Sequence, residues 1–207
     1  MKMKNLLIVL VAAMLLWSCS GDADHKAVKP LPVGYSTEKL ADCTVPAMFT
    51  SDDLDSSTAT LTMTVFSEDL YDAVAIQKMR KGDTLVFQGR SIVVDSIEND
   101  HGLLTINGGI EQDGACLQPD EGGTYRGLLL DDHSVYTQLG KVTLPVAAGL
   151  VVVDCGEEPD TPSDTISTDA QRYLAQAEGW RRDFSELNTT VLIENGTITR
   201  ITRRWIP

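Results

Sequence analysis

Histidine and cysteine are the side chains that could carry proton transfer or nucleophilic attack near neutral pH. The chain has three histidines, His25, His101 and His133, and its cysteines include Cys116 in mid-sequence. Cys116 could act as a nucleophile with His101 or His133 as its base, because such partners meet in space rather than in sequence. No HExxH, GxSxG, phosphate-loop or dinucleotide motif occurs. The sequence therefore predicts no catalytic residue.

Carboxylates are the other groups that could do chemistry, as acid–base pairs or as calcium ligands. With 30 acidic residues in the chain, no particular pair stands out as a glycosidase site. Asp52, Asp53 and Asp55, or Asp131 with Asp132, could hold calcium, but neither group has the spacing of an EF-hand loop. No CxxC motif or Cys/His cluster suggests zinc. Solvated acidic loops are the preferred interpretation, with no metal and no cofactor.

The overall charge limits the partners. The formal net charge is −13 at pH 7. A surface of this sign repels nucleic acid and anionic lipid headgroups and favours solubility. Nucleic acid is therefore excluded as a partner.

The first 18 residues have the order of a secretion signal. Lys2 and Lys4 precede an apolar run from Leu6 to Trp17. A helix of this length is too short to cross a bilayer core of about 30 Å, so the segment is predicted to be cleaved.

The cleavage site resembles the lipobox of bacterial lipoproteins. The lipobox-like segment is Leu16-Trp17-Ser18-Cys19. Counted from Cys19, leucine is at position −3 and a small residue is at position −1, although Trp17 at position −2 replaces the usual small residue. The resemblance implies that the mature chain begins at Cys19 and that lipid on this cysteine anchors it to a membrane. Ser20, Asp22 and Asp24 resemble the acidic surface-export signal of Bacteroidetes lipoproteins. The expected location is the outer membrane, with the cell surface as one option.

Three cysteines remain in the mature chain after Cys19. Cys43, Cys116 and Cys155 are an odd number for an oxidising compartment, so one disulfide and one leftover thiol are expected. Cys43 and Cys155 bracket the strand-rich region, which favours that pair over the other two pairings.

Hydropathy patterns predict a tether at residues 19–39 and a β-rich body at residues 40–155. The clearest strand is Thr58 to Phe66, where apolar residues alternate with threonines. Ser67 as N-cap and Gly82 as stop predict one short internal helix over residues 68–79.

Short strands fill the rest of the body. They are expected at Thr84 to Gln88, Ser91 to Ile97, Leu103 to Ile106, Ala115 to Leu117, Thr124 to Leu130, Val135 to Leu139, Lys141 to Leu144 and Leu150 to Asp154. Their spacing predicts a mainly β (α+β) fold, a small sandwich or barrel of antiparallel strands.

Residues 156–167 are acidic, contain Pro159 and Pro162, and are predicted to form a flexible or extended connector. Asp164-Thr165-Ile166 resembles the Bacteroidetes O-glycosylation motif, which makes Thr165 the candidate glycosylation site of this connector.

The C-terminal segment, residues 168–207, is predicted to form a helix and a hairpin that pack on the body as part of one domain. Leu174 belongs to the apolar stripe of the helix, and Asn195-Gly196 predicts a type I′ hairpin turn. An isolated hairpin is marginal in water, so its apolar residues must cover something. Arginine and tryptophan are common at binding sites, and the hairpin carries them as candidate ligand contacts: Arg200, Arg203, Arg204 and Trp205.

Residues from Val65 to Val153 and from Asp183 onward resemble uncharacterised secreted proteins of gut bacteria. Some of these end in the pattern seen here at Asn188 to Val191 and Arg203 to Pro207. That set has no known activity, so the resemblance implies no functional residues.

These observations predict a lipid-anchored envelope protein that is a non-enzymatic binding module for a protein or glycan. One alternative is an envelope hydrolase with carboxylate or cysteine chemistry. Another is a structural subunit of a surface assembly. A convergent pocket with a perturbed carboxylate would favour the enzyme. An exposed aromatic platform would favour the glycan binder, and an unpaired sheet edge would favour the subunit.

Overall fold

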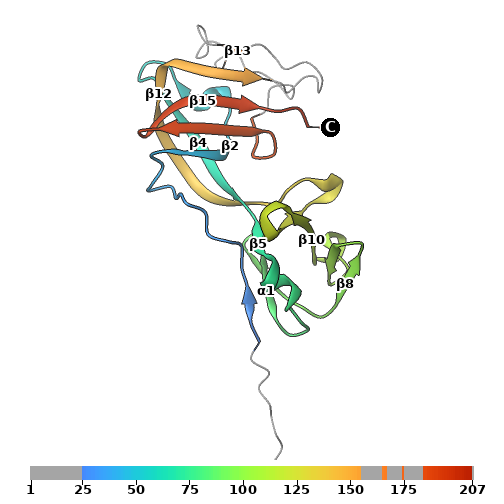
Figure 1. The fold of residues 1–207 in the computed structure, drawn as a ribbon. Helices are drawn as coiled ribbons and strands as arrows, with labels where there is room; N and C mark the ends of the chain where they lie inside the picture. Colours follow the sequence, from blue (N-terminus) through green and yellow to red (C-terminus); the bar gives the residue numbers. More distant parts are fainter. Residues whose placement is uncertain (1–24, 155–164, 167–173, 175–183, 207) are drawn as a thin grey trace, which may run out of the picture.

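The computed structural model describes residues 25–154, 165–166, 174 and 184–206. This part of the chain is mainly β, which confirms the predicted fold class. It forms two lobes, seen one above the other in Figure 1. The barrel lobe comprises residues 36–68, 136–154 and 184–206, and the insert lobe comprises residues 25–31 and 69–135.

The barrel lobe is a sheet closed on itself. Its five principal strands are β2 (Cys43–Met48), β4 (Thr60–Glu68), β12 (Tyr136–Asp154), β14 (Thr189–Glu194) and β15 (Thr197–Arg203). They follow the order β12-β15-β14-β2-β4, and a further pairing of β4 with β12 closes the ring. The short strands β3 (Leu54–Asp55) and β13 (Thr165–Ile166) lie at the two ends of this order. Closure leaves the principal strands no free edge.

Closure depends on the length of β12, which has 19 residues. Its first half pairs antiparallel with β4, from Tyr136 opposite Glu68 to Pro145 opposite Thr60. Its second half pairs in parallel with β15, and both ladders contain a register shift where the strand bends. The prediction of three separate strands between Val135 and Asp154 was wrong, because the residues that interrupt the apolar pattern bend one strand instead of ending it.

Alternation along β4 positions the barrel core. Leu61, Met63 and Val65 are each at most 1% exposed, as their two-residue spacing predicts. The same core receives apolar side chains from every principal strand and from four residues outside them, Leu40, Phe49, Leu174 and Phe184. Leu174 is the described residue of the predicted C-terminal helix, and it is buried at 1%. The other residues of that helix lie outside the described part of the chain.

The C-terminal hairpin forms as predicted. β14 and β15 pair antiparallel from Thr189 opposite Arg203 to Glu194 opposite Thr197. Asn195 and Gly196 both have positive φ angles, 51° and 72°, as a type I′ turn requires. The hairpin lies between β2 and β12, so it is a wall of the barrel rather than a cover laid over it.

The insert lobe is the chain between β4 and β12 together with the N-terminal strand β1. One sheet has the order β5-β11-β10-β9-β8, and a smaller one has the order β1-β6-β7. The bounds are β1 (Ala27–Val28), β5 (Leu70–Asp72), α1 (Ala73–Gln77), β6 (Thr84–Phe87), β7 (Arg90–Val93), β8 (Ile97–Asp100), β9 (Leu103–Ile106), β10 (Ala115–Asp120) and β11 (Thr124–Leu128). These elements enclose a second core that includes Tyr71, Phe87 and Leu117, each 0% exposed.

Two local predictions for this lobe need correction. The predicted helix over residues 68–79 is shortened to α1, because Leu70–Asp72 forms β5 and pairs with β11. Asp72 is then the N-cap of α1, and its carboxylate accepts a 2.7 Å hydrogen bond from the Ala75 N–H.

The predicted tether at residues 19–39 is folded from β1 onward, because Ala27 and Val28 pair in parallel with β6. Val28 is only 7% exposed, so burial of its side chain holds this segment on the lobe.

Asp69 lies where the two lobes meet. Its carboxylate accepts hydrogen bonds from Thr137 Oγ1 at 2.7 Å and from the Gln88 N–H at 3.1 Å. Its own N–H donates to the Val135 carbonyl at 2.9 Å, which ties the entry of the insert lobe to its exit. Burial raises the pKa of this carboxyl, although its hydrogen bonds act in the opposite direction.

Candidate functional site

The four candidate contacts of the hairpin separate into buried and exposed groups. Arg203 is 2% exposed, and its Nε and Nη2 donate to the two carboxylate oxygens of Asp154 at 2.8 and 2.9 Å. Its guanidinium also lies 5.6 Å from the ring centroid of Phe184. Arg203 therefore holds the barrel together, and its prediction as a ligand contact was wrong because alternation along β15 turns it inward.

Arg204 and Trp205 follow β15 and line a cleft of about 230 Å³, which we call the C-terminal cleft. Trp205 is 39% exposed. The cleft also includes Arg126 of β11 and Tyr136 at the start of β12, so both lobes contribute to it. Arg200 is exposed on β15 and is not part of the cleft lining.

Arg126 is held in a fixed orientation. Its Nη2 donates to Gln118 Oε1 at 2.7 Å, and its Nη1 lies 3.3 Å from Ser134 Oγ and 3.5 Å from the Asp132 carbonyl oxygen. Three partners on two neighbouring segments leave the planar guanidinium little rotational freedom. A fixed guanidinium is suited to binding a carboxylate with two parallel hydrogen bonds.

Tyr136 gives the cleft a second aromatic ring. Burial raises the pKa of its hydroxyl, nearby Glu68 acts in the same direction, and Arg204 opposes the shift. The phenol therefore stays protonated at neutral pH and can donate a hydrogen bond to a ligand. Trp205, Tyr136 and two arginines together form a surface for a ring-shaped, negatively charged group.

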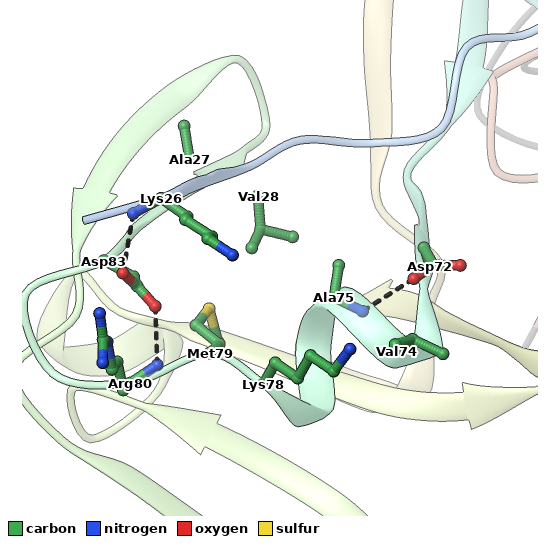
Figure 2. A pocket seen from close by; sticks show the side chains of 10 residues that line it. All are labelled: Lys26, Ala27, Val28, Asp72, Val74, Ala75, Lys78, Met79, Arg80 and Asp83. Carbon is green, nitrogen blue, oxygen red and sulfur yellow. Dashed lines mark hydrogen bonds between the residues drawn. The ribbon is translucent and has the colours of Figure 1, made fainter. Parts of the chain in front are cut away.

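A second cavity of about 450 Å³ lies in the insert lobe, between β1, α1 and the loop that follows α1. Figure 2 shows its lining, and we call it the anchor-side pocket because β1 follows the predicted lipidation site by few residues. Lys26, Lys78 and Arg80 supply positive charge at this pocket. Val28 and Met79 supply buried apolar surface.

Asp83 organises one end of the anchor-side pocket. Its two carboxylate oxygens accept from the Lys26 N–H at 2.8 Å and from the Arg80 N–H at 2.9 Å, as the dashed lines in Figure 2 show. These backbone bonds lower the pKa of Asp83, so the carboxylate is ionised at neutral pH. The carboxylate thus fixes β1 to the loop after α1 and sets the width of the pocket.

The remaining candidate chemistry is dispersed. Asp53 accepts from Thr50, and Asp55 accepts from Ser57 and Thr58, so these carboxylates cap turns. Within the described ranges, no group of three or more His, Cys, Asp or Glu residues could hold a metal ion. The same part of the chain contains no helix long and apolar enough to cross a membrane.

Cys116 lies on β10 between Thr105 of β9 and Leu128 of β11, and its sulfur faces Gly109. In the part that the structure describes, no hydrogen bond joins Cys116 to His101 or His133. His101 instead contacts its neighbour Asp100.

Several predicted sites cannot be placed. Cys19 and Cys155 lie outside the described residues, so lipidation and the pairing of Cys155 with Cys43 stay predictions. Cys43 is half-buried at the start of β2, and neither it nor Cys116 is in a disulfide within the described ranges. Thr165 lies in β13, opposite Val153, so this position of the predicted flexible or extended connector pairs with β12, and its glycosylation stays a prediction.

Sequence reasoning missed Arg126, Lys26 and Lys78. The one available signal was positive charge in an acidic chain, which does not show which cations share a cavity. No known protein family, curated protein or solved structure matches this chain.

Proposed function

We propose that this chain is a lipid-anchored, non-enzymatic binding module of the bacterial cell envelope, and that its C-terminal cleft binds a glycan carrying carboxylate groups. The anchor would be lipid on Cys19, with the outer membrane as the location. The observation that carries the binding proposal is the convergence of Arg126, Arg204 and Trp205 on one cleft.

The chemistry of the cleft favours an acidic sugar. An exposed indole such as Trp205 can stack on the apolar face of a sugar ring, and a hydrogen bond between charged groups is worth about 1.5–3 kcal/mol. The protein is acidic overall, but this cleft is lined by two arginines and one acid, Asp132, so its charge is locally complementary to a carboxylate. The volume of about 230 Å³ admits a small group such as one ring of a chain that continues into solvent.

Replacing the cleft residues tests this binding. We expect the mature chain to bind oligogalacturonate, an acidic oligosaccharide, in titration calorimetry. Trp205→Ala and Arg204→Ala should each weaken binding about ten-fold, since each removes on the order of 1.4 kcal/mol of contact.

Arg200→Ala is the matched control, because it removes an exposed arginine of the same hairpin outside the cleft lining. It should bind like the parent protein. Equal affinities for all three variants, or equal binding of a neutral oligosaccharide, would show that the cleft is not an acidic-glycan site.

The anchor has its own test. Cys19→Ala removes the thiol that lipidation requires, so incorporation of labelled fatty acid into the expressed protein should fall to background. Because lipobox cleavage also depends on this cysteine, the variant should either keep its signal segment uncleaved or be released without acyl chains. Label retained on the variant would contradict the proposed anchor.

A further inference from the structure

We infer that the anchor-side pocket binds the phosphate of an anionic phospholipid headgroup, so that the insert lobe rests on the membrane surface. The pocket gathers Lys26 and Lys78, whose side chains reach toward it from opposite walls in Figure 2. Within the described part of the chain, neither lysine is in an ion pair. The lining also contains the carboxylates of Asp72 and Asp83, which accept hydrogen bonds from backbone N–H groups, so three cationic residues stand against two acids. The remaining positive charge is complementary to a phosphate.

The surroundings of the pocket are those of an interfacial surface. Val74 of α1 lines the pocket and is 53% exposed, and Leu31, just after β1, is 39% exposed. The Leu31 N–H donates to the Leu70 carbonyl at 2.6 Å, which fixes Leu31 beside the start of β5, three residues before α1 begins. Exposed aliphatic side chains next to lysines are typical of surfaces that lie at the headgroup level of a bilayer.

Charge is divided unevenly over the insert lobe. Lysines and arginines cluster in two short segments, residues 26–29 and 78–81, which flank the pocket. Many of the exposed acids of the lobe lie elsewhere, on β8 and in the turns around β10 and β11, such as Glu98, Asp113 and Asp120. The net charge of −13 repels an anionic membrane, so only an oriented approach through the cationic side is favourable.

The position of β1 supplies an independent argument. His25 is six positions after Cys19, with five residues between them, and a chain of that length reaches at most about 20 Å. The strand that forms one wall of the pocket is therefore held near the bilayer whenever Cys19 carries lipid. This placement rests on the proposed anchor, whereas headgroup binding by the pocket does not.

Vesicle sedimentation tests the inference with the mature chain from residue 20, which contains every described residue and has no acyl chain. The two vesicle preparations are phosphatidylcholine alone and phosphatidylcholine with about one third phosphatidylglycerol, a composition that gives a negative surface potential. We expect binding to the anionic vesicles at low ionic strength and little binding to the neutral ones. The double variant Lys26→Gln/Lys78→Gln should partition about thirty-fold more weakly, because each lysine near the surface contributes roughly five-fold.

The matched control is Lys39→Gln/Lys141→Gln, which removes two exposed lysines of the barrel lobe and the same total charge. It should partition like the parent protein. Equal loss in both double variants, or binding that does not depend on phosphatidylglycerol, would overturn the inference. Competition by millimolar inorganic phosphate alone would show a free-phosphate site and would overturn the assignment to a membrane headgroup. Failure of this experiment leaves the fatty-acid and oligosaccharide tests unaffected, so the two proposals fail separately.

Discussion

Truncation before Asn188 is expected to abolish the cooperative unfolding of the barrel lobe. The change removes β14 and β15, which stand between β2 and β12 in the closed sheet. It also removes Val191, Ile193, Ile198 and Ile201, each 0% exposed in the barrel core. Burial of such side chains contributes about 1.5–3 kcal/mol each, so their loss is comparable to the whole stability of a typical domain, about 5–15 kcal/mol.

Thermal unfolding followed by circular dichroism measures this effect. The insert lobe has its own core, so the truncated chain should retain part of the β signal while the barrel transition disappears. A shorter truncation that removes only residues 205–207 is the control, because β15 ends at Arg203. It should unfold cooperatively, whereas cooperative unfolding of the longer truncation at an unchanged temperature would show that the hairpin is an appendage.

Arg203→Ala should destabilise the barrel lobe by about 3–5 kcal/mol, the usual cost of leaving one member of a buried ion pair without its partner. Arg203 and Asp154 are 2% and 5% exposed, and they join the end of β15 to the end of β12 through two hydrogen bonds. The substitution also removes the cation from the face of Phe184, which stacks on Phe49 at a centroid separation of 4.5 Å. Denaturant unfolding gives the change in free energy.

Arg204→Ala is the control for this measurement, because it removes the exposed arginine next in sequence. Its effect should be within about 0.5 kcal/mol. The double variant Arg203→Met/Asp154→Leu should be more stable than Arg203→Ala, since apolar replacement of both members leaves no buried charge. If Arg203→Ala and Arg204→Ala unfold at the same denaturant concentration, the buried pair does not hold the barrel together.

Local patterns in the sequence were sufficient for the elements whose stability is local. The Asn195-Gly196 turn was predictable because two consecutive positive φ angles favour these residue types. The β4 strand was predictable because its buried side chains recur at a period of two. These elements were enough to predict a mainly β fold, a small sandwich or barrel, and the structure shows which of the two forms.

Elements that depend on distant partners were not predictable in detail. Leu70–Asp72 follows a good N-cap, yet it forms a strand because β11 offers a free edge there. Val28 lies in a segment with tether-like composition, yet it is buried because β6 lies beside it. The free energy in both cases comes from contacts with residues far away in the sequence, which a local pattern does not contain.

The same distinction applies to the sites. The sequence identified Arg203, Arg204 and Trp205 as candidate ligand contacts, because arginine and tryptophan are the residue types that bind well. Their placement depends on the tertiary structure. Arg203 points inward and binds Asp154, whereas Arg204 and Trp205 line one cleft with Arg126. Lys26 and Lys78 line a second pocket. The sequence by itself determined which side chains can bind and which strands can form. The tertiary structure decided which side chains share a cavity. β12 pairs with both β4 and β15 to close the sheet, and a lobe is inserted between β4 and β12. Both features bring together residues that are far apart along the chain.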